Sequence, residues 1–218
     1  MGNRFAATLS GILIVGMILA AAWAVAILPP GTRVPIHWNA GGIANSWASA
    51  PFGLFLVPGI AILMFGLSMV LPKIDPRGAN LVRSSTAYGT IWLAITAFLA
   101  AIQGQMIAVA LGVPVRMPGY VTALVGGLFV VMGNVMGKLR SNYTVGIRTP
   151  WTLANEQVWD ETHRFGGWVF VGGGLVLMVS AFIAPDGHGF PYAIGIVTAV
   201  IVIATFVKSY LVWRRIKG

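Results

Sequence analysis

The chain has 218 residues, of which 57% are hydrophobic and 9% are charged, and its formal net charge is +9. This composition is too apolar for a soluble domain, and the lack of cysteine excludes disulfides, catalytic thiolates and iron–sulfur clusters. Because apolar runs of about 20 residues with short connections use up the length, we expect one integral membrane domain, residues 1–218.

Six apolar stretches are long enough to cross a bilayer. They are residues 5–28, 52–71, 86–111, 120–137, 165–184 and 191–213. Helix-ending signals separate them: Pro29 with Pro30, Pro72, Gly112 with Pro114, the cluster at 138–140, and Pro185. A backbone in lipid must satisfy its own hydrogen bonds, and these runs are too long for barrel strands. The expected fold class is all-α, a polytopic transmembrane bundle of about six helices.

The first stretch follows Arg4 and has small residues near its end, as a secretory signal does. It is longer than the roughly 7–15 apolar residues of a signal, so we expect a retained helix. Cleavage there would leave five spans.

The next connection is rich in Pro, Gly and Asn, which predicts an ordered turn structure rather than a helix. Two interpretations stay open. Trp38 can be an interfacial anchor and His37 a hydrogen-bonded loop residue, or the loop is a small extracytoplasmic recognition surface. The residues of that surface are Pro35, His37, Trp38, Asn39 and Gly41.

The spans themselves hold few polar groups: Gln103, Gln105 and Asn134, with scattered Ser and Thr. They predict hydrogen bonds between helices, and the glycines near 126, 133, 137 and 172–174 predict close helix packing. The alternative is that the three amides line the central cavity of a small transporter or flippase for a peptide or lipid.

The loop at 138–164 is dense and polar. Arg148 to Pro150 predicts a turn into a helix, with Pro150 at its first position and Thr149, or alternatively Thr152, as its cap. From Trp151 to Arg164, apolar and polar residues repeat at helical spacing. This predicts an interfacial amphipathic helix in the headgroup plane.

The same loop holds the candidates for an enzyme at the inner surface. They are Glu156, Asp160, Glu161, His163 and Arg164. Such an enzyme needs two or more of them to converge on one pocket. The loop lacks a His-Glu-x-x-His motif, and we expect no metal and no cofactor.

Topology follows from the 14 basic residues. With the N-terminus inside, twelve fall on the cytoplasmic side and only Arg33 and Arg116 on the other, which predicts an inner-membrane protein with both termini cytoplasmic. The net charge then reflects topology and contact with anionic headgroups, and we expect no direct binding of nucleic acid.

The run GIRTPWTL at 146–153, with its polar surroundings, closely resembles the signature of the SdpI family. The other residues that carry the resemblance are Gly133, Asn134, Lys138, Asn142, Tyr143, Asn155, Glu156, Val158, Trp159, Thr162, His163, Arg164, Gly166 and Gly167. The outer pattern from Pro35 to Asn39, with Gly41, resembles the uncharacterised membrane domain that commonly precedes this signature. We therefore expect an N-terminal hairpin of two helical spans at 1–72, with the outer loop between them. An SdpI-like part is expected at 120–214, with its inner loop at 138–164.

The resemblance implies a multi-pass immunity protein of the bacterial cytoplasmic membrane, and not an enzyme. Such a protein protects its cell against a secreted peptide toxin that attacks membranes, and the best-known members also signal by holding a transcriptional repressor at the membrane. The family motif points to Asn142, Tyr143, Gly146, Arg148, Thr149, Pro150, Trp151, Asn155, Trp159, Thr162, His163 and Arg164. Individual roles stay open, and Arg148 can instead be structural, pairing with Glu156 or with carbonyls at a helix end.

Overall fold

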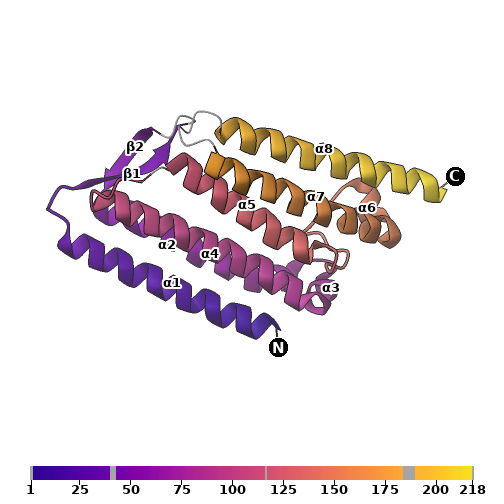
Figure 1. Cartoon of the computed structure of the whole chain (residues 1–218). Coiled ribbons are helices and arrows are strands. Elements are labelled where there is room, and N and C mark those ends of the chain that lie inside the picture. Colours follow the sequence, from indigo (N-terminus) through magenta and orange to yellow (C-terminus); the bar gives the residue numbers. More distant parts are fainter. Residues whose placement is uncertain (1, 40–42, 116, 184–189, 218) are drawn as a thin grey trace.

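The computed structural model describes residues 2–39, 43–115, 117–183 and 190–217 (Figure 1). Its helices are α1 (Gly2–Ile27), α2 (Ala50–Ile74), α3 (Gly78–Arg83), α4 (Ser85–Ala110), α5 (Met117–Met136), α6 (Pro150–Ala154), α7 (Glu156–Ile183) and α8 (Phe190–Lys217), and its strands are β1 (Arg33–Trp38) and β2 (Ala44–Ser49). Within these residues, six helices are long and apolar enough to cross a membrane. The predicted all-α multi-pass bundle is confirmed.

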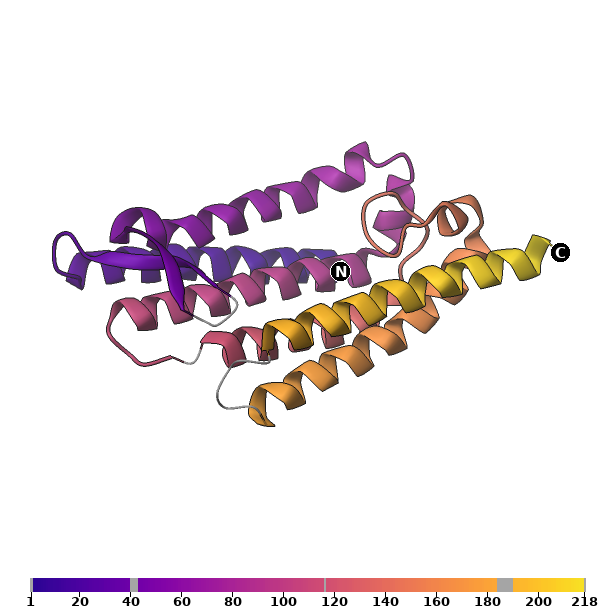
Figure 2. The same ribbon diagram turned by 90° about the horizontal axis from the view of Figure 1, so that it is seen from above.

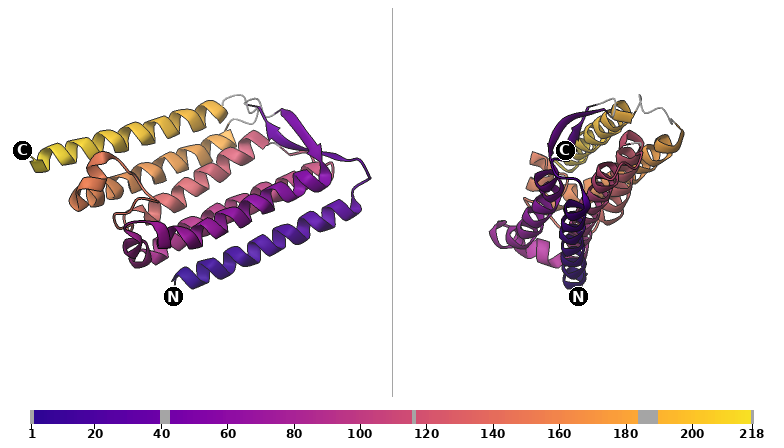
Figure 3. Two further views of the ribbon diagram at one scale, coloured as in Figure 1. Left: turned by 180° about the vertical axis from the view of Figure 1, so that it is seen from behind. Right: turned by 90° about the vertical axis from the view of Figure 1, so that its left-hand side faces the viewer.

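The long helices form two packed groups that run side by side (Figure 2). The first group is α1, α2 and α4, the second is α5, α7 and α8, and α4 packs on α5 to join them. Both termini lie at one end with α3 and α6, which we call the motif end, and the strands lie at the other, the hairpin end (Figures 1 and 3).

Glycines bring α5 and α7 together. A Cβ on Gly133 would lie 2.7 Å from the carbonyl oxygen of Gly167, and one on Gly167 would lie 2.8 Å from that of Gly133. Two turns away on each helix, Gly126 and Gly174 form a second reciprocal pair. A Cβ on Gly126 would lie 2.6 Å from the carbonyl oxygen of Gly174, and one on Gly174 would lie 2.5 Å from that of Gly126. Since only glycine permits such backbone approach, the packing role predicted for Gly126 and Gly133 is confirmed.

Two predicted helix boundaries are wrong. Pro72 does not end the second span, because α2 continues to Ile74 with Pro72 in its last turns. The fifth span does not begin at Phe165, since α7 starts at Glu156 and runs unbroken to Ile183. The expected break at Pro185 falls outside the described residues.

A β-hairpin occupies the loop for which only turns were expected. Strands β1 and β2 pair antiparallel, with Val34 opposite Ala48 and with irregular register beyond Pro35. Val34 is fully buried, and a Cβ added to Gly53 of α2 would lie 2.3 Å from its Cγ2. The hairpin is therefore packed onto the first turn of α2.

Candidate functional site

The SdpI-like motif surrounds two stacked, fully buried rings at the motif end. Trp159 and His163 lie one turn apart on α7, with ring centroids 3.9 Å apart and planes 19° apart, and neither ring is exposed. The Trp159 Nε1–H donates to the Leu139 carbonyl at 2.7 Å. This bond ties α7 to the motif loop, residues 137–149, which links α5 to α6.

The hydrogen bonds of His163 fix its tautomer. The backbone N–H of Ile147 donates to His163 Nε2 at 2.9 Å, so this nitrogen carries no proton. On the other side of the ring, Nδ1 lies 2.8 Å from the Trp159 carbonyl oxygen, which can only accept. The imidazole is therefore neutral with its proton on Nδ1, and it bridges the motif loop and α7.

Gly146 leaves room for this pair of rings. Its φ of 123° belongs to the region that favours glycine, and a Cβ there would lie 2.4 Å from His163 Nε2. Gly166 is equally confined, since a Cβ on it would lie 2.4 Å from Ile147 Cδ1. The glycines of the motif thus permit the contact between loop and helix.

Asn142 shapes the loop from within. It is fully buried, its Oδ1 accepts from the N–H groups of Thr144 at 2.9 Å and Val145 at 2.7 Å, and its Nδ2 donates to the Arg140 carbonyl. An Asn side chain that bonds backbone groups two and three residues ahead stabilises a turn. The neighbouring Tyr143 is 44% exposed.

Thr149 caps α6 as predicted. Its Oγ1 accepts from the Thr152 N–H at 3.2 Å, and Thr152 Oγ1 accepts from the Thr149 N–H at 2.9 Å, which completes a capping box with Pro150 in the first turn. Thr152 is the partner in this box, so the alternative of Thr152 as the cap is wrong.

Trp151 joins α6 to α8. Its ring lies against an aromatic cluster on α8, with centroid distances of 5.0 Å to Phe206, 5.2 Å to Tyr210 and 6.3 Å to Trp213. Edge and tilted contacts at such distances are favourable beyond the area that they bury.

The predicted interfacial helix from Trp151 to Arg164 is wrong, because the chain breaks at Asn155. Asn155 is extended, with φ −147° and ψ 126°, and its Oδ1 accepts from the N–H groups of Gln157 and Val158. It therefore caps the helix that follows, and α7 passes directly into the span. The apolar side of this helix is buried against protein: Thr162 is fully buried, and its hydroxyl has no partner among the described residues.

The motif's two arginines are exposed. Arg148 Nη1 donates to the Tyr143 carbonyl at 2.7 Å, a loop carbonyl rather than Glu156 or a helix end, so both specific partners expected for it are wrong. Arg164 lies on the exposed side of α7. Across the described residues, the salt bridge found at this end joins Arg215 to Glu161 at 2.6 Å.

The turn between α2 and α3 clamps the motif loop, and sequence reasoning missed it. Asp75 Oδ2 accepts from the Tyr143 N–H at 3.0 Å and from Thr144 Oγ1 at 2.5 Å. Arg77 donates to Ser141 Oγ and, at 2.9 Å, to the Leu153 carbonyl, and its guanidinium lies 4.9 Å from the centre of the Tyr143 ring.

Two more bonds complete this clamp. Asn80 Nδ2 donates to the Ser141 carbonyl at 2.8 Å, and the Arg140 N–H donates to Ser84 Oγ at 2.9 Å. A signal was available in the sequence, because Asp75 is the single acidic residue before Glu156. An isolated carboxylate in so apolar a chain indicates a fixed partner.

The outer-loop residues lie at the opposite end (Figure 1). In the hairpin Pro35 is buried, Trp38 is half-buried against the core of the first helix group, and Asn39 and His37 are exposed. His37 Nδ1 lies 2.6 Å from Asn45 Oδ1. Gly41 lies outside the described residues. Of the other four, His37 and Asn39 reach the surface and Trp38 does so in part, and their role in recognition stays a prediction.

The five enzyme candidates do not converge. Glu156, Asp160 and Arg164 are exposed, Glu161 pairs with Arg215, and His163 is enclosed. No group of three His, Asp or Glu side chains suited to a metal occurs in the part of the chain that the structure describes.

The amides proposed for a transporter cavity are also dispersed. Gln103 Nε2 donates to the Leu54 carbonyl at 2.8 Å, which is a helix-to-helix bond of the predicted kind. Gln103 is 1% exposed, and its Oε1 and that of Gln105 have no partner in the described structure. Asn134 faces outward on α5.

Comparison with known proteins finds two family matches, one that includes the SdpI-like motif and one that includes the β-hairpin. Residues 138–209 match the SdpI/YfhL protein family, and residues 12–62 match the Domain of unknown function (DUF1648). The chain is 26% identical over 189 residues to Immunity protein SdpI of Bacillus subtilis (strain 168), across 85% of this chain and 86% of that protein. Residues 138–209 are thus similar to the SdpI/YfhL family. No solved structure matches the chain.

The SdpI region holds every motif residue from Asn142 to Arg164, and the resemblance inferred from the sequence is confirmed. The clamp residues Asp75, Arg77, Asn80 and Ser84 lie in neither matched segment. They join the N-terminal helix group to the SdpI region through side chains that the two family patterns do not include.

Proposed function

We propose that this chain is a membrane immunity protein that protects its cell against a secreted, membrane-active peptide. The observation that carries the proposal is the similarity to Immunity protein SdpI along nearly the whole of both chains. The motif residues that this similarity includes form one interlocked structure around His163 and Trp159. A protein of this kind acts by binding and has no catalytic step.

The orientation is part of the proposal. With both termini in the cytoplasm of a bacterial cell, the motif end faces inward with its basic residues and the hairpin end faces outward. Both termini lie at the same end of the bundle, as six spans require (Figure 1).

Each end then has its own partner. The exposed part of the hairpin, with His37 and Trp47, meets the peptide at the outer leaflet. The exposed side chains of the motif end, Tyr143, Arg148 and Arg164, meet a cytoplasmic partner such as a transcriptional repressor. The exposure of these residues supports this division, since side chains that meet partners must reach the surface.

A small transporter or flippase remains the second hypothesis. It needs a polar passage between the two ends, and Gln103, its best-placed lining residue, is bonded within an apolar cluster. The packed glycine contacts between α5 and α7 also favour a closed bundle. We therefore place binding ahead of transport.

The test is survival of a toxin-sensitive bacterial host that expresses the protein during challenge with a panel of secreted membrane-active peptides. Protection against at least one peptide is expected. Arg148→Ala tests the motif end, with Arg83→Ala as an exposed control outside the motif, and membrane abundance is matched by blotting. No protection against any peptide, with normal abundance, would contradict the proposal and favour transport.

Signalling can be followed in the same cells with a reporter gene that the cytoplasmic repressor controls. If Arg148→Ala keeps protection but loses induction of this reporter, the two roles are separate. It would assign immunity to the bundle or hairpin and signalling to the motif end. Loss of both in Arg148→Ala but not in Arg83→Ala would make the motif end necessary for immunity.

A further inference from the structure

A cleft of about 340 Å³ opens between α1, α2 and α4 near the motif end. It exists because small residues face one another there: Ala6, Ala7 and Ser10 on α1, Ser68 on α2 and Gly89 on α4. Larger neighbours, among them Phe65 and Met69, complete apolar walls. The space is an open cleft between helices and not an interior void, so part of another molecule can occupy it without a rearrangement of the bundle.

The cleft opens towards the surroundings of the bundle. Val82 and Met69, which border it, are 64% and 48% exposed. In a membrane, such apolar surface contacts lipid chains. A chain from the bilayer can therefore reach the cleft past the exposed side chains of Met69 on α2 and Val82 on α3.

A single cation lies among the residues that line the cleft. Lys73 is in the last turn of α2 and is exposed, and no described carboxylate lies within ion-pair distance of it. Two hydroxyl groups of the lining are bonded within the protein, Tyr88 to the Ser68 carbonyl at 2.8 Å and Ser68 to the Phe65 carbonyl. The Nε1–H of Trp92, which also lines the cleft, has no partner among the described residues. Lys73 is thus the charged group, and Trp92 an additional donor, that can meet an anionic ligand.

Lys73 lies near the end of a candidate membrane span, where lipid headgroups are expected. It ends an apolar helix, next to the start of α1, where Arg4 marks the beginning of the first span. Lysines at such positions reach the interface and attract anionic headgroups.

We propose that this cleft binds one anionic phospholipid, with an acyl chain between the small residues of α1 and α4 and its phosphate on Lys73. A zwitterionic lipid of the same chain length fits the walls but gains less from the unneutralised cation. This proposal is independent of immunity, because it rests on the cleft and its charge alone.

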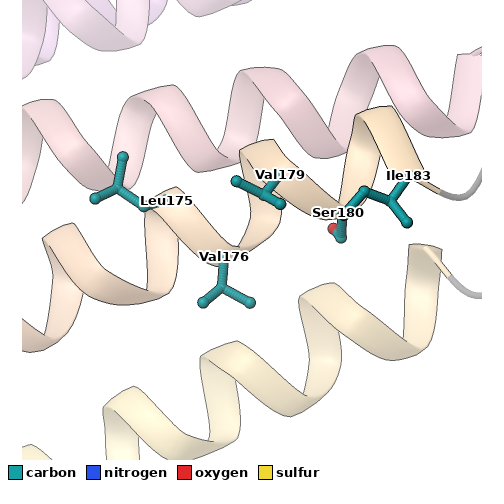
Figure 4. A pocket seen from close by; sticks show the side chains of 5 residues that line it. All are labelled: Leu175, Val176, Val179, Ser180 and Ile183. Atoms are coloured by element: carbon teal, nitrogen blue, oxygen red, sulfur yellow. The ribbon is translucent and has the colours of Figure 1, made fainter.

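A second groove shows why the charge matters. It has a volume of about 460 Å³ and is formed by α7 alone, with Leu175, Val176, Val179, Ser180 and Ile183 along it (Figure 4). No charged residue lines this groove. Nothing there selects one lipid over another, so it serves as an internal comparison for bulk lipid contact.

The experiment is native mass spectrometry of the full chain in detergent, titrated separately with phosphatidylglycerol, phosphatidylcholine and glycerol phosphate. One tightly bound phosphatidylglycerol is expected. Lys73→Gln lowers its affinity by about fivefold, the effect of one basic residue at an anionic surface, and Ala7→Phe, which fills the cleft, abolishes that binding event. Glycerol phosphate, which lacks acyl chains, does not bind.

Two controls match these variants. Lys138→Gln removes another exposed lysine at the same end, and Thr8→Phe adds the same ring on the exposed side of α1; neither changes the bound lipid. Equal binding of both lipids, or equal binding in all variants, would overturn the proposal and leave bulk lipid contact only. Binding of glycerol phosphate as strong as that of the lipid would replace it with a phosphate site.

Discussion

The hairpin end and the motif end are built in opposite ways. At the hairpin end, the distinctive polar residues His37 and Asn39 are exposed, and the fold depends on strand pairing and on Val34 against Gly53. At the motif end, many of the distinctive polar and aromatic residues are buried, and most of these are hydrogen-bonded within the protein. The bonded ones are Asn142, Thr149, Thr152, Trp159 and His163, and Thr162 is buried without a hydroxyl partner among the described residues. A polar signature in a membrane protein can therefore describe internal architecture as much as a binding surface.

One helix links the two regions. α2 begins at Ala50, directly after β2, and Asp75 follows its last residue. The hairpin packs on its first turn and the clamp extends from its other end. The variants below test whether the two ends differ in rigidity as their burial indicates.

The largest effect is expected from Trp159→Ala. It removes a fully buried ring, its stack on His163 and its bond to Leu139, and such truncations cost about 3–5 kcal/mol. Unfolding in denaturant should shift strongly, with reduced membrane abundance. Trp168→Ala, at a ring that is 79% exposed, is the matched control and should change the free energy of unfolding by less than about 1 kcal/mol. An equal loss of unfolding free energy in the two variants would mean that the buried rings of Trp159 and His163 do not stabilise the motif end.

Gly146→Ala comes next and has an unusual control in Gly31→Ala. Both glycines have positive φ, 123° and 84°, but a Cβ on Gly31 meets nothing within 4 Å. Backbone strain alone costs roughly 1–2 kcal/mol, and the clash with His163 adds about 1–3 kcal/mol. The free energy of unfolding should therefore fall further for Gly146→Ala than for Gly31→Ala. An equal fall in the two variants would show that a Cβ at residue 146 does not clash with His163.

Asp75→Asn tests the clamp with little change of shape. The carboxylate accepts three bonds, from the N–H groups of Arg77 and Tyr143 and from the Thr144 hydroxyl. Weakening these charge-assisted bonds should cost about 1–3 kcal/mol. Amide hydrogen exchange at Tyr143 and Thr144 should accelerate, while Asp160→Asn, at an exposed carboxylate, should leave it unchanged. Unchanged amide exchange in both variants would show that the motif loop keeps its structure without the charge of Asp75.

Much of the fold could be predicted because lipid imposes simple rules. The six spans, the helix-ending glycine near 112 and the cap at Thr149 followed from local sequence. The helix break at Asn155 was missed because helical spacing continues through it, and an Asn can cap a new helix as well as occupy a turn.

The site was predicted only in part, for a physical reason. The motif residues were found, but their roles depend on contacts between distant segments, such as Asp75 with Thr144, 69 positions apart. The stack of His163 on Trp159 also requires the positive φ of Gly146 in another segment. Local patterns do not encode such pairings, whereas the absence of a continuous helix in the outer loop was predicted from its Pro and Gly content, although its strands were not.

The smallest effect on stability, and the sharpest separation of the two ends, is expected from His37→Ala. His37 is exposed, with one bond to Asn45, so the free energy of unfolding should change by less than about 1 kcal/mol, and Tm in detergent by only a few degrees. Ser46→Ala, at its partner position on β2, is the control. If the hairpin meets the peptide, His37→Ala loses protection at normal Tm and abundance while Ser46→Ala keeps it. Because a stability defect is excluded by the Tm, full protection in His37→Ala would remove this side chain from peptide recognition and direct the search to the lipid-facing helices.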